Sequence, residues 1–298
     1  MEWLVSLFGA ALVVITLRDL FHTLWHPTRR GGLSRVVMTA LWRLSRPLRT
    51  RSGHVAGLAG PLAVVSVVGL WAGTIILGWA IVYWPHMPDS FAFANELRAS
   101  EHTGLLDSLY LSMVHVSTLG LGDIAPTEEW LRIAAPLEAL VGFVLLTATV
   151  SWVLEIYPAL ARRKALALRL AVLLRTDRRE RPSGEVLTAS LLEGLAADVL
   201  RVRIDFTQYA EAYYFHDGED ETSLAVVSGY ACELARRGAA ASDADVRRAA
   251  DVLSEALDDL ATVLDQRFLH TGGSAAEVFG AYAADHGHRR TTGPAAGG

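Results

Sequence analysis

Thirty consecutive residues, Val55–Trp84, carry no charged side chain. A helix of this length, at about 1.5 Å per residue, exceeds the roughly 30 Å hydrocarbon core of a bilayer and can cross it with some tilt. A second stretch, Ile133–Leu154, contains Glu138 as its single charge, and a third, Trp3–Leu17, reaches membrane length if its helix continues to Trp25. No basic residue precedes the third stretch, which favours a retained span over a cleaved leader. The sequence therefore predicts an all-α membrane protein with three spans.

The distribution of arginine predicts how these spans are oriented. Residues 28–54 contain seven arginines and no acid, whereas residues 85–104 contain three acids and one arginine. Short cytoplasmic loops carry the excess of Lys and Arg, so the first loop is expected inside the cell and the second outside. We therefore expect a multi-pass protein of the cell membrane, with its N-terminus outside and everything after Tyr157 in the cytoplasm.

The segment before the last span, TGLLDSLYLSMVHVST, has apolar residues at helical spacing but is too short to cross a bilayer. A helix that enters the membrane without crossing it must turn back, and the turn here is TLGLGD. Irregular backbone at membrane depth is tolerated where it is buried in protein or lines an aqueous path. We predict a re-entrant pore helix over residues 103–117, followed by an ion filter over residues 118–123.

Gly120 and Gly122 separate the filter interpretation from a nucleotide-binding loop. With Ala125 they form G-x-G-x-x-A, a pattern that follows a strand and opens a helix in dinucleotide-binding folds. Here a helix is predicted before the glycines and Pro126 follows them, so we reject that interpretation. Successive carbonyls of a strand point to opposite sides, and residues with positive φ, which glycine adopts without steric penalty, turn them toward one axis. The carbonyls of residues 118–121, with the Thr118 hydroxyl, would then replace the hydration shell of a cation.

A ring of such carbonyls requires several copies of the chain, because one chain supplies one loop. The pore helix ends at the filter with the negative pole of its dipole, which favours a cation there. Asp123 is expected at the outer mouth, where its charge would raise the local cation concentration.

The segment LLDSLYLSMVHVSTLGLGDIAP resembles the pore helix and filter of tetrameric potassium channels, whose signature is T-[TS]-V-G-Y-G-D. The similarity extends over roughly Ala56–Leu160. It implies a homotetramer with one pore loop per subunit that conducts potassium passively through a filter formed by Thr118, Leu119, Gly120, Leu121 and Gly122. It also implies a gating hinge in the inner helix at Gly142. No cofactor is expected, since potassium is the permeant ion.

Two residues depart from this signature. Leu121 stands where most members have a tyrosine whose hydroxyl braces the filter, and His115 replaces the usual threonine or serine. We hypothesise that Glu138 faces the back of the pore helix and restores the bracing by hydrogen bonding to His115, Ser112 or Ser117. Two alternatives stay open: a weakly selective cation channel, and a non-conducting membrane-anchored sensor or assembly protein.

The remaining chain is predicted to be helical around this pore. Residues 27–54 are expected to form a basic amphipathic segment on the lipids of the inner leaflet. Beyond Pro158 the helical pattern continues, with breaks at Gly- and Pro-containing loops. The predicted domains are an N-terminal transmembrane helix (1–26), a pore domain (55–160) with outer helix 55–84 and inner helix 130–157, a basic linker helix (161–182), a cytoplasmic bundle of about four helices (183–286) and a disordered tail (287–298).

Charge and motif content exclude several other functions. Residues 185–267 carry seventeen acids against seven arginines, which excludes a nucleic-acid partner for the bundle. His22 and His26 share a helix face but lack a third metal ligand, and Cys232, the single cysteine, suits a packing role. We find no catalytic constellation and expect no enzyme. The gating stimulus and any cytoplasmic ligand or partner cannot be read from the sequence.

Overall fold

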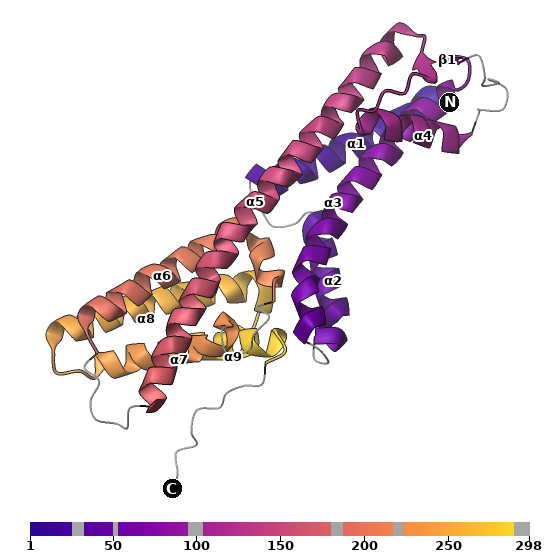
Figure 1. The fold of residues 1–298 in the computed structure, drawn as a ribbon. Coiled ribbons are helices and arrows are strands. Elements are labelled where there is room, and N and C mark those ends of the chain that lie inside the picture. The colour runs from indigo at the N-terminus through magenta and orange to yellow at the C-terminus, as the bar shows by residue number, and fades with distance from the viewer. Residues whose placement is uncertain (26–32, 50–52, 95–103, 180–186, 217–222, 289–298) are drawn as a thin grey trace. The chain divides into compact units, whose positions relative to one another are not determined.

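The computed structural model describes residues 1–25, 33–49, 53–94, 104–179, 187–216 and 223–288. These residues form two compact units, one from residues 1–37 and 65–154 and the other from residues 38–64 and 155–298. Figure 1 shows the elements of both, which we describe separately.

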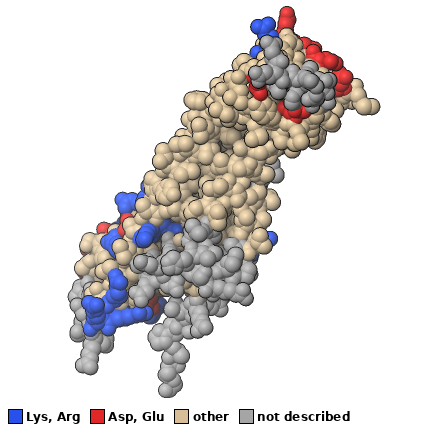
Figure 2. All heavy atoms as spheres, turned by 45° about the vertical axis from the view of Figure 1, so that its right-hand side comes forward, with Lys and Arg blue, Asp and Glu red and all other residues tan. Residues whose placement is uncertain are grey.

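Three helices are long and apolar enough to span a membrane: α1 (Glu2–Trp25), α3 (Gly53–Tyr83) and α5 (Glu129–Arg179). This result confirms the prediction of three candidate spans. Their outward faces are apolar, with Leu7 on α1 and Ile133 and Leu146 on α5 each more than 60% exposed. Figure 2 shows the same property on the surface, since charged side chains are sparse over this unit except at the end where acidic side chains gather. The exposed apolar surface is what lipid or neighbouring subunits would cover.

The N-terminal helix α1 packs closely on α3 because both carry a small residue at the contact. A Cβ added at Gly9 would lie 2.4 Å from the carbonyl oxygen of Gly78. Near this contact, Ser6 Oγ donates to the carbonyl of Val82 (3.1 Å). Such close approach through small residues is the ordinary way in which helices associate in membranes.

A short helix, α4 (Leu105–Val116), and two short strands complete the first unit. Gly104 N–H donates to the Asp107 carboxylate (3.1 Å) at the start of α4, where an acid also suits the helix dipole. Strand β1 (Phe91–Phe93) follows the short helix η1 (Trp84–His86) and pairs antiparallel with β2 (Ile124–Pro126), with Ala92 opposite Ala125. The molecule is therefore mostly helical rather than all-α. A buried cluster joins these pieces: Val82, Tyr83, Met87, Phe91, Leu111, Ile124 and Leu131.

The second unit is a helical bundle. Its helices are α6 (Ala189–Gln208), α7 (Leu224–Ala239), α8 (Ala244–Leu264) and α9 (Ala275–Asp285), with a short 3-10 helix η3 (Ala210–Tyr214) after α6 and a π turn η5 (Asp265–Leu269) after α8. The Thr188 hydroxyl caps α6 by accepting from Leu191 N–H, and the Asp243 carboxylate caps α8 by accepting from Asp245 N–H. Leucine, valine and alanine side chains of α6, α7 and α8 fill the core.

Two features of the helices were not expected from the sequence. The inner helix and the linker helix are one uninterrupted helix, α5, which continues through Pro158. In addition, α2 (Leu33–Arg49) buries Met38 and Trp42, and Trp42 packs against aromatic residues of the bundle. At these two positions the apolar face of α2 contacts protein rather than remaining available for lipid. Of the predicted disordered tail, residues 289–298 lie outside the described residues.

Candidate functional site

The loop after α4 has the backbone conformation that an ion filter requires. The φ angle is positive at every second residue, with 59° at Thr118, 55° at Gly120 and 76° at Gly122. A Cβ added at either glycine would meet no atom within 4 Å, so conformation rather than crowding within the chain requires glycine at these positions. In an ordinary strand successive carbonyls point to opposite sides, and this alternation of positive φ can turn them toward one axis.

The same loop is open to its surroundings in a single chain. Residues 117–122 are exposed, and Leu119 and Leu121 expose 66% and 60% of their surface. The loop is nevertheless fixed at its start, because Thr118 N–H donates to the carbonyl of His115 (2.8 Å) and Leu119 N–H donates to that of Val114 (3.0 Å). An exposed loop with defined conformation is what one subunit of a shared filter would present.

Behind α4, one buried carboxylate joins three helices. Glu138 of α5 has no exposed surface. Its Oε1 accepts from Ser112 Oγ (2.6 Å) on α4, and its Oε2 accepts from the Tyr83 hydroxyl (2.6 Å) on α3. His115 Nδ1, on the last turn of α4, lies 3.2 Å from the same Oε2. The structure thus brings together Glu138, Ser112 and His115, whereas Ser117 bonds instead to the carbonyl of Val114 (3.2 Å).

Tyr83 belongs to this site but was not among the residues expected there. An aromatic residue at the end of an apolar run suggests a position at the membrane interface, and that interpretation is wrong for Tyr83, which is fully buried. Its ring also packs edge-on against His115, with the ring centroids 6.0 Å apart. The one signal in the sequence was the single acid of the apolar stretch Ile133–Leu154, because a buried carboxylate needs donors from its neighbours.

The residue that follows the predicted filter accepts hydrogen bonds through both its side chain and its main chain. The Asp123 carboxylate accepts from the Tyr110 hydroxyl (2.6 Å), and its main-chain carbonyl accepts from Ala94 N–H (2.8 Å) just after β1. Tyr110 is a further residue that sequence reasoning missed. Because β2 begins at the next residue, the β1–β2 pair anchors this end of the filter to the loop after α3.

A second acid supports the same outer region. Glu128 accepts from Ser90 Oγ (2.7 Å) and from the indole N–H of Trp130 (2.8 Å). The hydrogen bond from Ser90, followed by that from Trp130, holds the pKa of Glu128 below its usual value. This carboxylate therefore stays ionised next to the strand pair.

Gly142 is buried where α5 passes close to the end of α4. A Cβ added at Gly142 would lie 1.9 Å from the carbonyl oxygen of Val116, a distance that no side chain could tolerate without movement of one helix. The helix continues through this position. The geometry thus gives Gly142 a packing role, and its role as a hinge stays a prediction.

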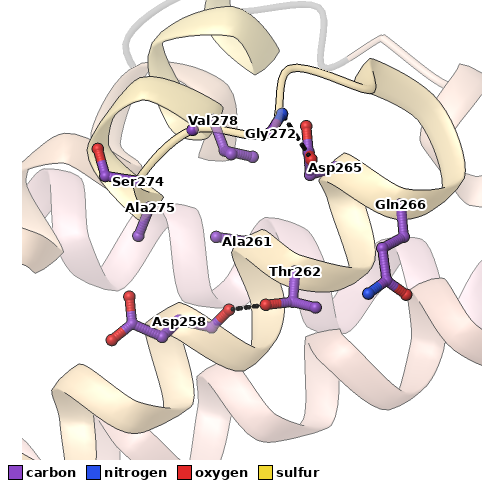
Figure 3. Close-up of a pocket in the computed structure, with 10 residues that line it drawn as sticks. Asp258, Ala261, Thr262, Asp265, Gln266, Gly272, Ser274, Ala275 and Val278 are labelled. Carbon is purple, nitrogen blue, oxygen red and sulfur yellow. Dashed lines mark hydrogen bonds between the residues drawn. The ribbon is translucent and has the colours of Figure 1, made fainter.

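Among its described residues, the second unit has shallow cavities rather than a site with converging polar groups. The cavity drawn in Figure 3, about 330 Å³, lies between the end of α8 and the start of α9. One of its two lining carboxylates, that of Asp265, already accepts from Thr271 N–H, Thr271 Oγ1 and Gly272 N–H of its own loop. Among the described residues, no group of three or more metal-ligating side chains comes together. His26 of the predicted histidine pair lies outside the described residues.

Comparisons with known proteins point to the same segment. The family model described as "Ion channel" matches residues 69–157, which include the filter and the helices that flank it. The uncharacterized membrane protein YdjJ of Bacillus subtilis is 26% identical over 150 residues, which make up 50% of this chain and 42% of YdjJ. Protein LctB of Geobacillus stearothermophilus is 30% identical over 114 residues, which make up 36% of this chain and 77% of LctB. The chain thus spans less than half the length of YdjJ but most of LctB.

No solved structure gives a significant match to the chain. The match to LctB extends over more than three quarters of that protein, and the family model includes the loop whose glycines have positive φ. Together these similarities show that the chain belongs to the ion channel family.

Proposed function

We propose that the chain forms a homotetrameric, passive, potassium-selective channel that conducts through residues 118–122. The observation that carries this proposal is the alternation of positive φ at Thr118, Gly120 and Gly122, in the segment that matches an ion channel family. The main-chain carbonyls of these residues would coordinate a dehydrated cation, and four copies around one axis would complete each ring of oxygens. The C-terminal end of α4 next to the loop adds a negative electrostatic potential that favours a cation.

Potassium selectivity requires that the ring of carbonyl oxygens keep its dimensions. The chain has Leu121 in place of the filter tyrosine that could maintain them. The carboxylate of Glu138 offers a substitute, because it ties α4 to α3 through Tyr83 and to its own helix α5. Two of its partners, Tyr83 and Ser112, are fully buried, and His115 is partly buried. A filter that such contacts already hold in place has a smaller free-energy cost of ordering when an ion of the correct size binds. We infer that Glu138, Ser112, His115 and Tyr83 brace the filter from behind.

The arrangement in the membrane follows from the same proposal. The filter exit, Asp123 and the β1–β2 pair would face the outside, and the bundle would face the cytoplasm, as the arginines of residues 28–54 require. Asp123, held by Tyr110, would concentrate cations at the mouth.

Flux through liposomes tests this function. The purified full-length chain is reconstituted with a potassium gradient, and influx is followed with a potential-sensitive or proton-coupled dye. We expect potassium flux that is abolished by Gly120→Asp, because an aspartate cannot adopt the glycine conformation without strain and places a side chain at the filter. Gly69→Ala serves as the control, since a Cβ at Gly69 would meet no atom within 4 Å.

Replacing potassium by sodium distinguishes the alternatives. Equal fluxes of the two ions would contradict potassium selectivity and favour a weakly selective cation channel. A folded tetramer without flux of either ion would contradict conduction and favour a sensor or assembly protein.

A further inference from the structure

A short segment of the cytoplasmic unit contacts helices that continue toward the membrane. Residues 210–215, which we name the junction segment, comprise the 3-10 helix η3 and Phe215. Ala212, Tyr213 and Tyr214 are buried although the segment is short. A short 3-10 helix makes few backbone hydrogen bonds of its own, so its conformation depends on partners from other elements.

The first partner is α5, the helix that carries Glu138 and Gly142. Arg163 of α5 is 97% buried, and its guanidinium donates to the carbonyls of Ala212 (2.5 Å) and Phe215 (2.9 Å). Next to it, Arg162 makes a two-pronged interaction with the carboxylate of Asp205 on α6, with distances of 2.6 and 2.8 Å. Guanidinium groups held by two fixed acceptors define position as well as charge. The cytoplasmic half of the inner helix is thus fixed to the junction segment.

The second partner is α2, which connects to the first and second spans along the chain. The indole N–H of Trp42 and the hydroxyl of Tyr213 both donate to Oδ2 of Asp285, at 2.7 and 2.6 Å. Thr39 Oγ1 lies 3.1 Å from the Tyr214 hydroxyl. Asp285 is the last residue of α9, where an acid opposes the helix dipole, so helix stability does not explain it. Its contact with α2 and the junction segment does.

The third partner is α3, the outer helix of the pore domain. Gly60 of α3 is buried, and a Cβ added there would lie 2.6 Å from Cγ of Phe215 and 3.0 Å from its Cα. His286, just after α9, donates from Nε2 to the carbonyl of Tyr213 (3.0 Å), since a carbonyl can only accept. One segment therefore meets α2, α3 and α5 on one side and the end of α9 on the other.

We propose that the junction segment couples the cytoplasmic bundle to the pore. A displacement of α9 in the bundle would change the hydrogen bonds that Asp285 and His286 make to the segment. It would thereby change the contacts that the segment makes with α2, α3 and α5. The proposal rests on the proposed channel function, because its readout is ion flux. It assigns a regulatory position to residues that lie far along the chain from the filter.

A disulfide between Gly60→Cys and Phe215→Cys tests this coupling in the full-length chain, with Cys232→Ser to remove the native thiol. The pair lies within reach of a disulfide because a Cβ at residue 60 would lie 3.0 Å from Cα of residue 215, so the two elements need to separate only slightly to reach disulfide geometry. The matched control joins Gly238→Cys to Ala250→Cys, whose Cβ atoms would lie 2.8 Å apart across α7 and α8 within the bundle. Each protein is oxidised with diamide, and bond formation is verified by peptide mapping before potassium flux is measured in liposomes.

We expect the junction disulfide to change flux by about fivefold or more, the lower end of ordinary coupling between sites, and reductant to reverse the change. The control disulfide should leave flux within about twofold of the reduced protein. A verified junction disulfide without effect, or an equal effect of the control, would overturn the coupling while leaving the channel function intact. Absence of flux in the unmodified chain would overturn both proposals.

A variant without a new covalent bond covers the case in which the cysteine pair does not fold. Trp42→Phe keeps an aromatic ring but removes the N–H that donates to Asp285. It therefore weakens the attachment of α2 to the end of α9, whereas the disulfide strengthens the attachment of α3 to the junction segment. We expect Trp42→Phe to change potassium flux in the direction opposite to the change caused by the junction disulfide. If the cysteine pair cannot be obtained, we expect the flux of Trp42→Phe to differ from that of the wild type. Trp84→Phe, at an exposed residue of the other unit, is the control. Equal flux in Trp42→Phe and wild type would count against the proposal.

Discussion

At the scale of single residues, the buried carboxylate of Glu138 is the group that we propose supports the filter from behind. Its partner Tyr83 comes from the outer helix, so a hydroxyl from another element stands behind a filter that has leucine at position 121. Removing one donor from a buried acceptor costs about 1–3 kcal/mol in water-soluble proteins and somewhat less within membranes. We expect Tyr83→Phe to lower both the thermal stability of the assembly and its preference for potassium over sodium.

Flux ratios and a thermal unfolding curve measure these two effects. Tyr157→Phe, at a residue of α5 with 60% of its surface exposed, is the matched control. Glu138→Gln should act in the same direction as Tyr83→Phe, because an amide cannot accept at both positions. Unchanged selectivity in both variants would refute the bracing role of the cluster.

Gly142 permits a sharp distinction between packing and bending. Gly142→Ala would place a methyl group 1.9 Å from the carbonyl oxygen of Val116 and push the end of α4 away from α5. We expect this to cost about 1–3 kcal/mol of stability and to reduce flux. Gly73→Ala, at an open position of α3, should change neither. If Gly142→Ala instead alters the open probability at unchanged stability, the hinge is the better explanation.

The sequence was more informative about Glu138 than about the residues around it. A single acid in an apolar span is costly unless it has donors, which pointed to the back of the pore helix and to Ser112 and His115. Tyr83 and Tyr110 gave no such signal, because an aromatic residue near the end of a span is equally suited to the lipid interface. Contacts of this kind become visible only when separate helices are placed side by side.

At the scale of elements, long apolar runs were predictable and short or context-dependent pieces were not. Hydrophobicity and length identified α1, α3 and α5 as spans. Strands β1 and β2 have three residues each, too few for an alternating pattern to emerge. Pro158 suggested an end to the inner helix, yet α5 continues, because surrounding contacts can compensate for one lost backbone hydrogen bond. The contact of α2 with the bundle joins residues far apart in sequence and leaves no local pattern.

The 3-10 helix η3 leads to a prediction about pH. Burial raises the pKa of Glu211 to about 7, against a weaker opposing effect of its own backbone hydrogen bond and of Arg267. The folded chain therefore binds this proton more tightly than the unfolded chain, and the free energy of unfolding should fall as the pH rises from about 4.5 to about 7 and then level off.

Glu211→Gln should remove this component and stabilise the protein by about 1–2 kcal/mol at neutral to alkaline pH. Thermal unfolding of the full-length chain in detergent, followed from acid to alkaline pH, measures it. Glu255→Gln, at an exposed residue of α8, is the control and should leave the pH dependence unchanged. An identical pH profile in Glu211→Gln and wild type would show that the carboxyl is already ionised in the folded chain at acidic pH.

At the scale of the whole molecule, membership of the ion channel family agrees with the expectation that the chain is not an enzyme. The matched segment ends at residue 157, so most of the bundle lies beyond it. The bundle has a core of its own, formed largely by α6, α7 and α8, and it contacts the C-terminal half of α5 through Arg162 and Arg163. These contacts all lie within the second unit.

In a single chain the proposed filter loop is exposed and not enclosed by other protein. This exposure leads to a prediction about assembly. Leu119 and Leu121 are more than half exposed although they lie within residues 118–122, the segment that would coordinate the ion. Their exposure is relieved if neighbouring chains close the ring, and closed rotational symmetry is the usual outcome for identical subunits. We expect native mass spectrometry of the protein in lipid nanodiscs to show four times the 32.3 kDa of one chain. Electron microscopy of the same sample should show a fourfold axis through the filter, whereas a folded monomer or dimer that still conducts potassium would require a pore of a different kind.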